Sequence, residues 1–240
     1  MKILGVKIDS VTYQEALEKA KKLLDSEGKH YIVTPNPEIV VQAQKDPEFK
    51  KILNSADLSL PDGVGLVALS GLGGDKLPER VTGVDFLDGL AALAENFGFS
   101  LYLLGGEQNV AKKAAEELQR RYPKLNIVGA SSGNPDSKFD NETRKLLINK
   151  KIDILAVAYG SPKQEKWIAR NLRLLNVKVA IGVGGAFDFI SGNKRRAPVW
   201  MQKAGLEWAF RLINDPSRAK RQLVLPYFVY LIFRDKFKST

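Results

Sequence analysis

The sequence predicts an α/β protein in which helices flank a parallel sheet and an all-helical, basic appendage follows. Short apolar segments alternate with segments of helical periodicity through most of the chain. Most of the apolar segments end at glycine or proline, as strands that lead into loops do. After Pro198 only helical segments follow, over 199–214 and 217–236. We therefore expect a Rossmann-like α/β domain, 1–196, and a helical appendage, 197–240.

Strands and helices alternate in the first half of the chain. Thr12 and Glu15 form a capping box at the start of the first helix. Pro35 and Pro61 follow the second and third strands and end them. We expect strands over 3–8, 30–34 and 57–60 and helices over 12–27, 38–44, 47–54 and 83–97.

The second half alternates more clearly. We expect strands over 100–104, 126–130, 152–158 and 178–183 and helices over 109–122, 141–149 and 163–175. In such folds the ligand lies at the carboxyl ends of the strands. The loops that would gather there are Thr34–Asn36, Gly105-Gly106, Gly160 and Gly184-Gly185.

Cysteine and histidine are almost absent from the 240 residues: there is no cysteine, and His30 is the one histidine. This excludes disulfides, Cys-ligated zinc or iron–sulfur sites, a cysteine nucleophile and multi-histidine metal sites, and it disfavours a Ser–His triad. Hydrophobic residues make up 44% of the chain, too many for a disordered protein. Any catalysis must rest on carboxylates, amides, hydroxyls and basic groups.

The formal net charge of +10 is concentrated at the C-terminal end. From Ser191 onward the chain has 11 basic and three acidic residues, or +8, and the rest of the chain carries only +2. A basic end of this kind favours a phosphate-bearing partner: a nucleic acid, an anionic membrane surface or a phosphorylated substrate.

The longest apolar run, LVLPYFVYLIF over 223–233, lies within this basic end. It is shorter than the roughly 20 residues needed to cross a bilayer, and it suits a helix that lies in the membrane interface. Packing in a helical core or in a subunit interface is the alternative. The N-terminus does not resemble a signal peptide, so we expect a cytoplasmic protein.

Two glycine-rich segments follow predicted strands. Gly182-Val183-Gly184-Gly185-Ala186-Phe187 begins like a dinucleotide fingerprint, but Phe187 occupies the place of the last Gly or Ala. No acidic residue closes a second strand about 20 residues later, so a nicotinamide oxidoreductase is the weak alternative. This segment and Gly105-Gly106 are each either a tight turn or a cradle of backbone N–H groups for a phosphate or sugar.

Four polar residues near predicted strand or helix ends have either a structural or a chemical role. Asp62, between Pro61 and a glycine, either caps local amides or acts as a general base. Asp188 either caps a helix or binds a ligand hydroxyl. Arg80 either pairs with a neighbouring glutamate or faces an anionic leaving group. Gln164 either caps a helix or hydrogen-bonds a sugar.

A metal site of the usual kind is missing from the sequence. No Asp-x-Asp occurs, and this is the carboxylate pair that commonly holds Mg²⁺ or Mn²⁺ under a nucleotide diphosphate. If a phosphate leaves, arginines and backbone amides must neutralise it.

Eight motifs, taken in order, resemble those of the WecG/TagA/CpsF glycosyltransferases from the first strand to the C-terminus. They are Thr34-Pro35-Asn36-x-Glu38, Pro61-Asp62-Gly63-x-Gly65, Glu79-Arg80-x-x-Gly83-x-Asp85, Tyr102-Leu103-Leu104-Gly105-Gly106, Gly160-x-Pro162-Lys163-Gln164-Glu165-x-Trp167, Gly182-Val183-Gly184-Gly185-Ala186-Phe187-Asp188, Arg196-Ala197-Pro198 and Gly205-Leu206-Glu207-Trp208-x-x-Arg211-Leu212. The chain looks closest to the TagA branch, the N-acetylmannosaminyltransferases of wall teichoic acid synthesis.

The resemblance implies transfer of a sugar from a UDP donor to a membrane-bound undecaprenyl diphosphate sugar. For the TagA branch the implied donor is UDP-N-acetylmannosamine, and the implied acceptor is undecaprenyl-diphosphate-linked N-acetylglucosamine. The implied product has a β-1,4 linkage and forms with inversion, without a metal ion or other cofactor. Another UDP-hexose donor, such as the uronic acid of UDP-N-acetylmannosamine, stays open, as does a homo-oligomer.

By motif position, the resemblance implies that Asp62 is the base that takes the proton from the acceptor 4-hydroxyl. Thr34 and Asn36 would contact the donor sugar or its N-acetyl group, and Gln164 would lie beside the same pocket. Other implied residues would stabilise the departing UDP (Arg80, Arg211, Arg218 and Arg221) or shape the nucleotide site (Gly105, Gly184, Gly185 and Asp188).

The appendage would bring the enzyme to its lipid-linked acceptor. A basic helical segment with an apolar run is expected to dock on anionic lipid at the inner face of the cell membrane and to bring arginines over the active site. The alternative from another class is a basic nucleic-acid-binding α/β module, although no known basic–aromatic pattern is present.

Overall fold

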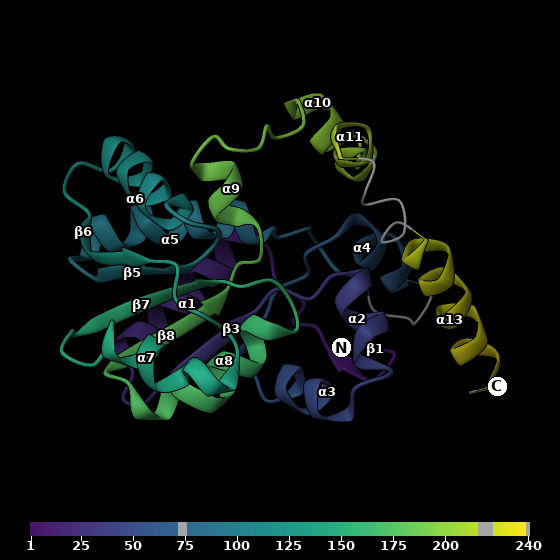
Figure 1. Ribbon diagram of the computed structural model, residues 1–240. Coiled ribbons are helices and arrows are strands. Elements are labelled where there is room, and N and C mark those ends of the chain that lie inside the picture. The colour runs from purple at the N-terminus through teal and green to yellow at the C-terminus, as the bar shows by residue number, and fades with distance from the viewer. Residues whose placement is uncertain (72–75, 216–222, 239–240) are drawn as a thin grey trace.

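A six-stranded parallel sheet lies at the centre of the protein (Figure 1). The computed structural model describes residues 1–71, 76–215 and 223–238. The strand order is β4-β3-β8-β7-β5-β6, and every neighbouring pair is parallel. The strands are β3 (His30–Val33), β4 (Leu58–Ser59), β5 (Ser100–Gly105), β6 (Asn126–Ser131), β7 (Ile152–Ala158) and β8 (Val177–Gly182). The predicted α/β fold is confirmed.

The first residues form a separate hairpin of β1 (Lys2–Ile3) and β2 (Val6–Lys7), which pair antiparallel. The prediction of one strand over 3–8 was wrong because the chain reverses at Leu4 and Gly5. Both turn residues have a positive φ, 49° and 75°, as a type I′ hairpin turn requires.

Four helices cover one face of the sheet (Figure 1). They are α1 (Tyr13–Asp25), α5 (Gly83–Phe97), α6 (Val110–Arg121) and α9 (Ala186–Ile190). Their apolar side chains form one hydrophobic cluster with Leu101 and Leu103 of β5 and Ile154 of β7. Thr12 forms the predicted capping box with Glu15 at the start of α1.

The opposite face is divided between two helical groups. The helices are α2 (Pro37–Ala43), α3 (Pro47–Asn54), α4 (Val64–Ser70), α7 (Asp140–Lys145) and α8 (Lys163–Asn171). Trp167 and Ile168 of α8 pack on Leu155 of β7. Near β3, the helices α2, α3 and α4 form another cluster, together with Val33 and the N-terminal hairpin.

Two helices of this face are shorter than predicted. The helix expected over 141–149 is α7, which ends at Lys145 and is followed by turns. The helix expected over 163–175 is α8, and a 3₁₀ turn over Leu172–Leu174 follows it.

The chain leaves β5 and β7 in opposite directions, because α6 and α8 lie on opposite faces of the sheet. In open α/β sheets a ligand commonly lies at such a point, beyond the carboxyl ends of the strands. The two strands approach closely there, and the Gly106 N–H donates a hydrogen bond to the Ala158 carbonyl, 2.9 Å away. Gly105 has a φ of 116°, and a Cβ on it would lie 2.7 Å from the Ala158 carbonyl carbon.

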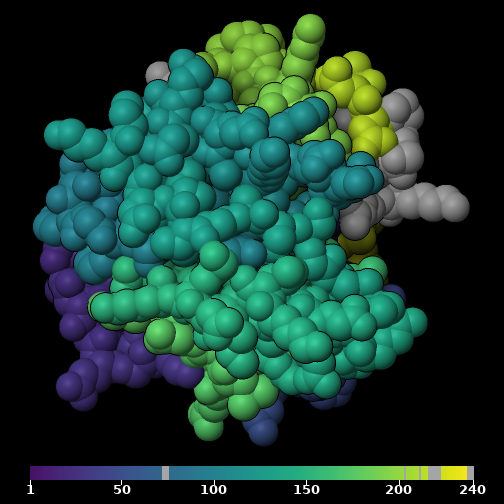
Figure 2. Space-filling model, turned by 60° about the vertical axis from the view of Figure 1, so that its left-hand side comes forward, coloured from purple at the N-terminus to yellow at the C-terminus, as the bar shows by residue number. Residues whose placement is uncertain are grey.

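The appendage begins with two short helices, α10 (Val199–Lys203) and α11 (Glu207–Asn214). The prediction of one helix over 199–214 was wrong because the chain turns at Gly205. Its φ of 72° lies in the left-handed region that favours glycine at a helix end. Figure 2 shows a group of yellow-green atoms of the late part of the chain at the top of the molecule.

The last helix, α13 (Val224–Lys238), lies against α2 and α4 (Figure 1). Phe228 and Leu231 are only 1% and 3% exposed, and they enter the same cluster as Ile3 and Val6. The alternative prediction, that this apolar run packs in a core, is therefore confirmed for these two side chains.

Residues 217–222 of the predicted last helix lie outside the described residues. None of the helices within the described ranges is both long and apolar enough to span a bilayer. The domain boundary at residue 196 stays a prediction.

We predict that Gly105→Ala lowers the free energy of unfolding by about 2–4 kcal/mol, because the methyl group collides with backbone atoms at a strained φ. Urea denaturation followed by circular dichroism measures this. Gly71→Ala is the control, since its φ is −61° and no atom of the described, non-adjacent residues lies within 4 Å of the new Cβ; a change within about 0.5 kcal/mol is expected. Equal losses in the two variants would contradict the close approach of β5 and β7.

Candidate active site at the carboxyl edge of the sheet

Thr34, Asp62 and Gly184 follow the three neighbouring strands β3, β4 and β8. The Thr34 side chain is buried, and its hydroxyl donates a hydrogen bond to the Gly182 carbonyl oxygen, 3.0 Å away. The backbone N–H of Asp62 donates to the Pro35 carbonyl oxygen, also at 3.0 Å. The carboxyl edge of the sheet therefore brings these loops together.

The Asp62 carboxylate lies at the N-terminus of α5. Its Oδ2 accepts a hydrogen bond from the Gly83 backbone N–H, 3.2 Å away. The partial positive charge of a helix N-terminus favours an ionised carboxylate at this place. Thr34 lies at the same helix end, because a Cβ on Gly83 would be 3.6 Å from the Thr34 methyl carbon. Thr34 and Asp62 therefore meet at the start of α5, where Asp62 stays partly exposed.

Asn36 begins α2. Its side-chain oxygen accepts a hydrogen bond from the Ile39 N–H, at 3.0 Å, so asparagine serves as the N-cap that this helix needs. Its NH₂ group has no hydrogen-bond partner in the described part of the chain.

Gln164, in the first turn of α8, connects α8 to the loop after β8. Its side chain is only 1% exposed. Oε1 accepts a hydrogen bond from the Gly184 N–H at 2.9 Å, and Nε2 donates to Oε1 of Glu165 at 2.8 Å. Gly182 makes room for this arrangement, since a Cβ there would lie 2.7 Å from Nε2 of Gln164. Gln164 therefore holds the turn at Gly184.

Glu165 is completely buried beneath Gln164. Burial raises the pKa of its carboxyl group, because the charged form loses its contact with water. Its Oε2 has no hydrogen-bond partner among the described residues, and neither has the Ser161 hydroxyl. A neutral carboxyl group suits this environment better than an ionised one.

Near the start of α5, two ion pairs of the described residues hold the appendage and the residue directly before it against the body. Arg196 binds Asp85 through two hydrogen bonds, of which the one from Nη2 to Oδ2 is 2.6 Å long. Nη2 of Arg80 donates to Oε2 of Glu207 at 3.0 Å, and both of these side chains are mostly buried. Arg80 therefore pairs with α11, not with its neighbour Glu79.

The charges of this cluster stabilise one another. Burial opposes the ionisation of Asp85, but hydrogen bonds from Arg196 and Thr82 outweigh it and hold the pKa of Asp85 below its ordinary value. The hydrogen bond to Asp85 is the main cause that raises the pKa of Arg196, and the charges of Glu207 and Asp62 add to it. Asp62 therefore lies within electrostatic range of the Arg196 guanidinium, directly before the appendage.

The remaining predicted site residues fall into two groups. Some lie at the end of β5 or in the segment after β8, and the side chains of the others are not described by the structure. Gly106 and Phe187 are close, since a Cβ on Gly106 would be 3.8 Å from the Phe187 ring. Asp188 forms an ion pair with Lys194 at 3.2 Å. Arg211 lies in α11, but its side chain is outside the described part of the structure, as are Arg218 and Arg221 entirely.

No three His, Asp or Glu side chains within the described ranges lie close enough together to hold a metal ion.

Comparison with known proteins identifies the family. The model of the glycosyl transferase WecG/TagA/CpsF family matches residues 1–240. This chain is a WecG/TagA/CpsF glycosyltransferase. Its similar relatives include three proteins that share one name, "N-acetylglucosaminyldiphosphoundecaprenol N-acetyl-beta-D-mannosaminyltransferase".

The similarity to these relatives covers most of each chain. The protein of Bacillus subtilis is 35% identical over 90% of this chain and 84% of its own length. That of Bacillus spizizenii is 35% identical over 88% and 81%. That of Staphylococcus aureus strain MRSA252 is 32% identical over 98% and 93%. The nucleic-acid and nicotinamide alternatives find no support here.

Three residues of this WecG/TagA/CpsF glycosyltransferase were not among the predicted site residues: Asp85, Arg196 and Glu207. All three stand in the motifs that carry the family resemblance, which was the available signal. Their partners could not be read from the sequence, since Asp85 and Arg196 are 111 positions apart.

We predict that Glu165→Gln raises the melting temperature near neutral pH. The folded chain binds the Glu165 proton more tightly than the unfolded chain, whose glutamate pKa is about 4.3. The wild type therefore loses stability as the pH rises above that value, towards the raised pKa of the folded state. Glutamine keeps an acceptor for Gln164 and cannot ionise.

Thermal unfolding between about pH 4 and pH 8 measures this effect, and the advantage of the variant is expected to grow with pH. Glu142→Gln, at an exposed position of α7, is the control and should follow the wild type. A difference between Glu165→Gln and wild type that is constant with pH would contradict a buried neutral carboxyl group.

Proposed function

We propose that this protein transfers N-acetylmannosamine from UDP-N-acetylmannosamine to undecaprenyl-diphosphate-linked N-acetylglucosamine, a step of wall teichoic acid linkage-unit synthesis. Membership of the WecG/TagA/CpsF family supports this. The observation that carries the proposal is the one name that three relatives share. These relatives are 32–35% identical to this chain, and the matched region covers 81–93% of their own lengths.

In the proposed reaction the acceptor 4-hydroxyl attacks C1 of the donor sugar from the face opposite UDP. The β-1,4 bond forms while the bond from C1 to the UDP oxygen breaks, so the configuration at C1 inverts. Asp62 is the proposed general base, which takes the hydroxyl proton as the new bond forms. A partly exposed carboxylate, oriented by the Gly83 N–H, suits this role.

Thr34 and Asn36 are the proposed contacts of the donor sugar or its N-acetyl group. The Thr34 hydroxyl donates its hydrogen to Gly182, so its oxygen can accept from an O–H or N–H of the sugar. Asn36 uses its oxygen to cap α2, so its NH₂ group can donate to an acetyl carbonyl. Gln164 would hold the Gly184 turn beside this pocket.

The departing UDP gains negative charge, which the site must neutralise. We propose that arginines do this without a metal ion: Arg80, Arg211, Arg218 and Arg221. The ion pair with Glu207 keeps Arg80 near the start of α5 before substrates bind. The backbone at Gly105, Gly184 and Gly185 and the carboxylate of Asp188 are the proposed walls of the nucleotide site.

The acceptor is anchored by its lipid, so we propose that the protein works as a peripheral protein at the inner face of the cell membrane. Exposed apolar side chains of the appendage support this role, and they include Val199, Trp200, Leu206, Trp208, Ile213, Leu223, Tyr230 and Phe233. Such side chains suit the interface of a bilayer, and the basic residues of the same segment attract anionic lipid.

We predict that Asp62→Asn lowers kcat by about 100-fold or more, because asparagine keeps an acceptor for Gly83 but cannot take a proton. The rate of UDP release from UDP-N-acetylmannosamine, with a water-soluble lipid-diphosphate acceptor analogue, measures this. Asp25→Asn, exposed at the end of α1, is the control. Turnover close to wild type in Asp62→Asn would exclude Asp62 as the base.

We predict that an excess of EDTA leaves the wild-type rate unchanged, because the proposed neutralising groups are arginines. The same UDP-release assay checks this, with and without added Mg²⁺. A rate abolished by EDTA and restored by Mg²⁺ would overturn the metal-free mechanism.

We predict that UDP-N-acetylmannosamine is the preferred donor when UDP-hexoses are compared with one acceptor. The comparison includes its uronic acid and UDP-N-acetylglucosamine, and the ratio of kcat/KM values measures the preference. Faster transfer of the uronic acid would replace the proposed donor while leaving the reaction class intact.

A further inference from the structure

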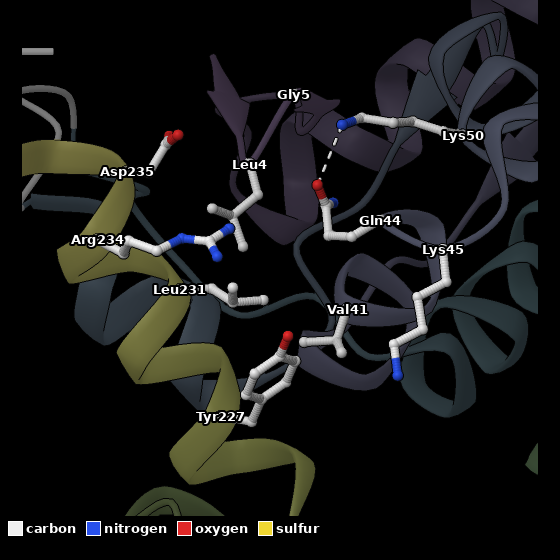
Figure 3. A pocket seen from close by; sticks show the side chains of 10 residues that line it. All are labelled: Leu4, Gly5, Val41, Gln44, Lys45, Lys50, Tyr227, Leu231, Arg234 and Asp235. Carbon is white, nitrogen blue, oxygen red and sulfur yellow. Dashed lines mark hydrogen bonds between the residues drawn. The ribbon is translucent and has the colours of Figure 1, made fainter. Parts of the chain in front are cut away.

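A pocket of about 520 Å³ lies between α13, the end of α2 and the N-terminal hairpin (Figure 3). It is separate from the candidate active site. Asn36, at the active edge, begins α2, whereas the pocket lies at Val41 and Gln44, where this helix ends. The helix α2 has 7 residues, and each adds about 1.5 Å along the axis. The active edge and the pocket therefore lie about 10 Å apart along this helix.

Three basic side chains from three helical segments surround the pocket. Lys45 follows α2, Lys50 belongs to α3, and the Arg234 guanidinium extends from α13 across the opening towards Leu4 (Figure 3). None of the three has a carboxylate within ion-pair distance in the described part of the chain. Lys45 and Arg234 are exposed, whereas Lys50 is half-buried. Among the described residues Lys50 donates only to the neutral Gln44 amide, at 3.2 Å.

One acidic residue, Asp235, also lines the pocket. This residue has an interaction of its own. Figure 3 shows it apart from the Arg234 guanidinium. The pocket therefore carries an excess of positive charge that the protein does not neutralise.

Part of the pocket wall is apolar. The Tyr227 ring is 43% exposed and Leu4 is half-buried, whereas Val41 and Leu231 lie beneath the surface, only 6% and 3% exposed. A ligand that matches both kinds of surface has an anionic group at one end and hydrocarbon next to it.

The surface beside the pocket continues this pattern along α13. Tyr227 stacks on Tyr230, with ring centroids 6.1 Å apart, and the Arg234 guanidinium lies 5.9 Å from the Tyr230 ring. Tyr230 and Phe233 are 56% and 41% exposed. Exposed aromatic rings next to cations are typical of a surface at the level of lipid headgroups.

Stabilisation of the helix end is a simpler explanation for one of the three cations. A lysine after the last turn of α2 interacts favourably with the negative end of that helix. This accounts for Lys45, but it does not explain why α3 and α13 contribute a cation to the same opening.

We propose that this pocket binds the phosphate headgroup of an anionic phospholipid, with Lys50 and Arg234 as its main phosphate contacts and Leu4 and Tyr227 against the start of the hydrocarbon. The inference rests on the proposed function at the membrane surface. It adds a headgroup site between α13 and the body of the protein, at a distance from the acceptor, which would orient the active edge relative to the membrane.

Vesicle binding tests the proposal. The probes are sedimenting vesicles of phosphatidylcholine, with and without phosphatidylglycerol, and the full-length protein. Lys50→Ala/Arg234→Ala is expected to weaken binding to the phosphatidylglycerol vesicles by about 30-fold, from about 1 kcal/mol for each basic residue. Arg234→Ala alone, at an exposed position, is expected to weaken it by about fivefold and serves if the double variant is unstable.

The matched control is Lys112→Ala/Lys113→Ala, which removes the same charge from exposed positions of α6, on the other face of the sheet. Its effect should stay below about threefold, since such attraction falls off within a Debye length. Equal losses in the two double variants would overturn the proposal, because binding would then depend on net charge alone.

Sugar transfer to a water-soluble acceptor separates this proposal from the proposed function. All variants are expected to keep the wild-type rate in that assay, because none changes the active edge. If the variants lose vesicle binding as expected but the wild type transfers no sugar, the headgroup pocket is supported and the proposed transfer reaction is refuted. Transfer with the opposite vesicle pattern would refute the pocket alone.

Discussion

The N-terminus of α5 is the point on which the active edge depends. The Gly83 N–H orients the Asp62 carboxylate, and Thr34 and the Val183 carbonyl both lie next to Gly83. Two residues further on, Asp85 binds Arg196 and thereby holds the residue that directly precedes the appendage. One helix end therefore sets the proposed base, the sugar-contacting threonine and the appendage relative to one another.

The sheet could be predicted from the sequence because buried parallel strands are short apolar runs that end in glycine or proline. All six sheet strands lie within a few residues of their expected places. The N-terminal hairpin could not be predicted, since residues 3–8 form one apolar run and leucine is a rare residue at positive φ. The break at Gly205 was missed for a related reason: a glycine inside a helical pattern often causes no break.

The site could be predicted only in part. Thr34, Asp62 and Gly184 could be placed because each lies within three residues of the end of a strand, and the topology alone brings neighbouring strand ends together. The two ion pairs that hold the appendage could not, because Arg80 and Glu207 are 127 positions apart and their pairing depends on how the appendage packs. Gln164 was found by its motif, but its contact with Gly184 depends on the position of β8.

The shared cluster of the N-terminal hairpin and α13 has a consequence for the order of synthesis. Ile3 and Val6 leave the ribosome long before Phe228 and Leu231, which lie in the same cluster. The core that contains all four is incomplete until α13 has emerged. The nascent body therefore carries an uncovered apolar surface until α13 closes it, so a chain truncated before α13 would expose a surface that invites aggregation.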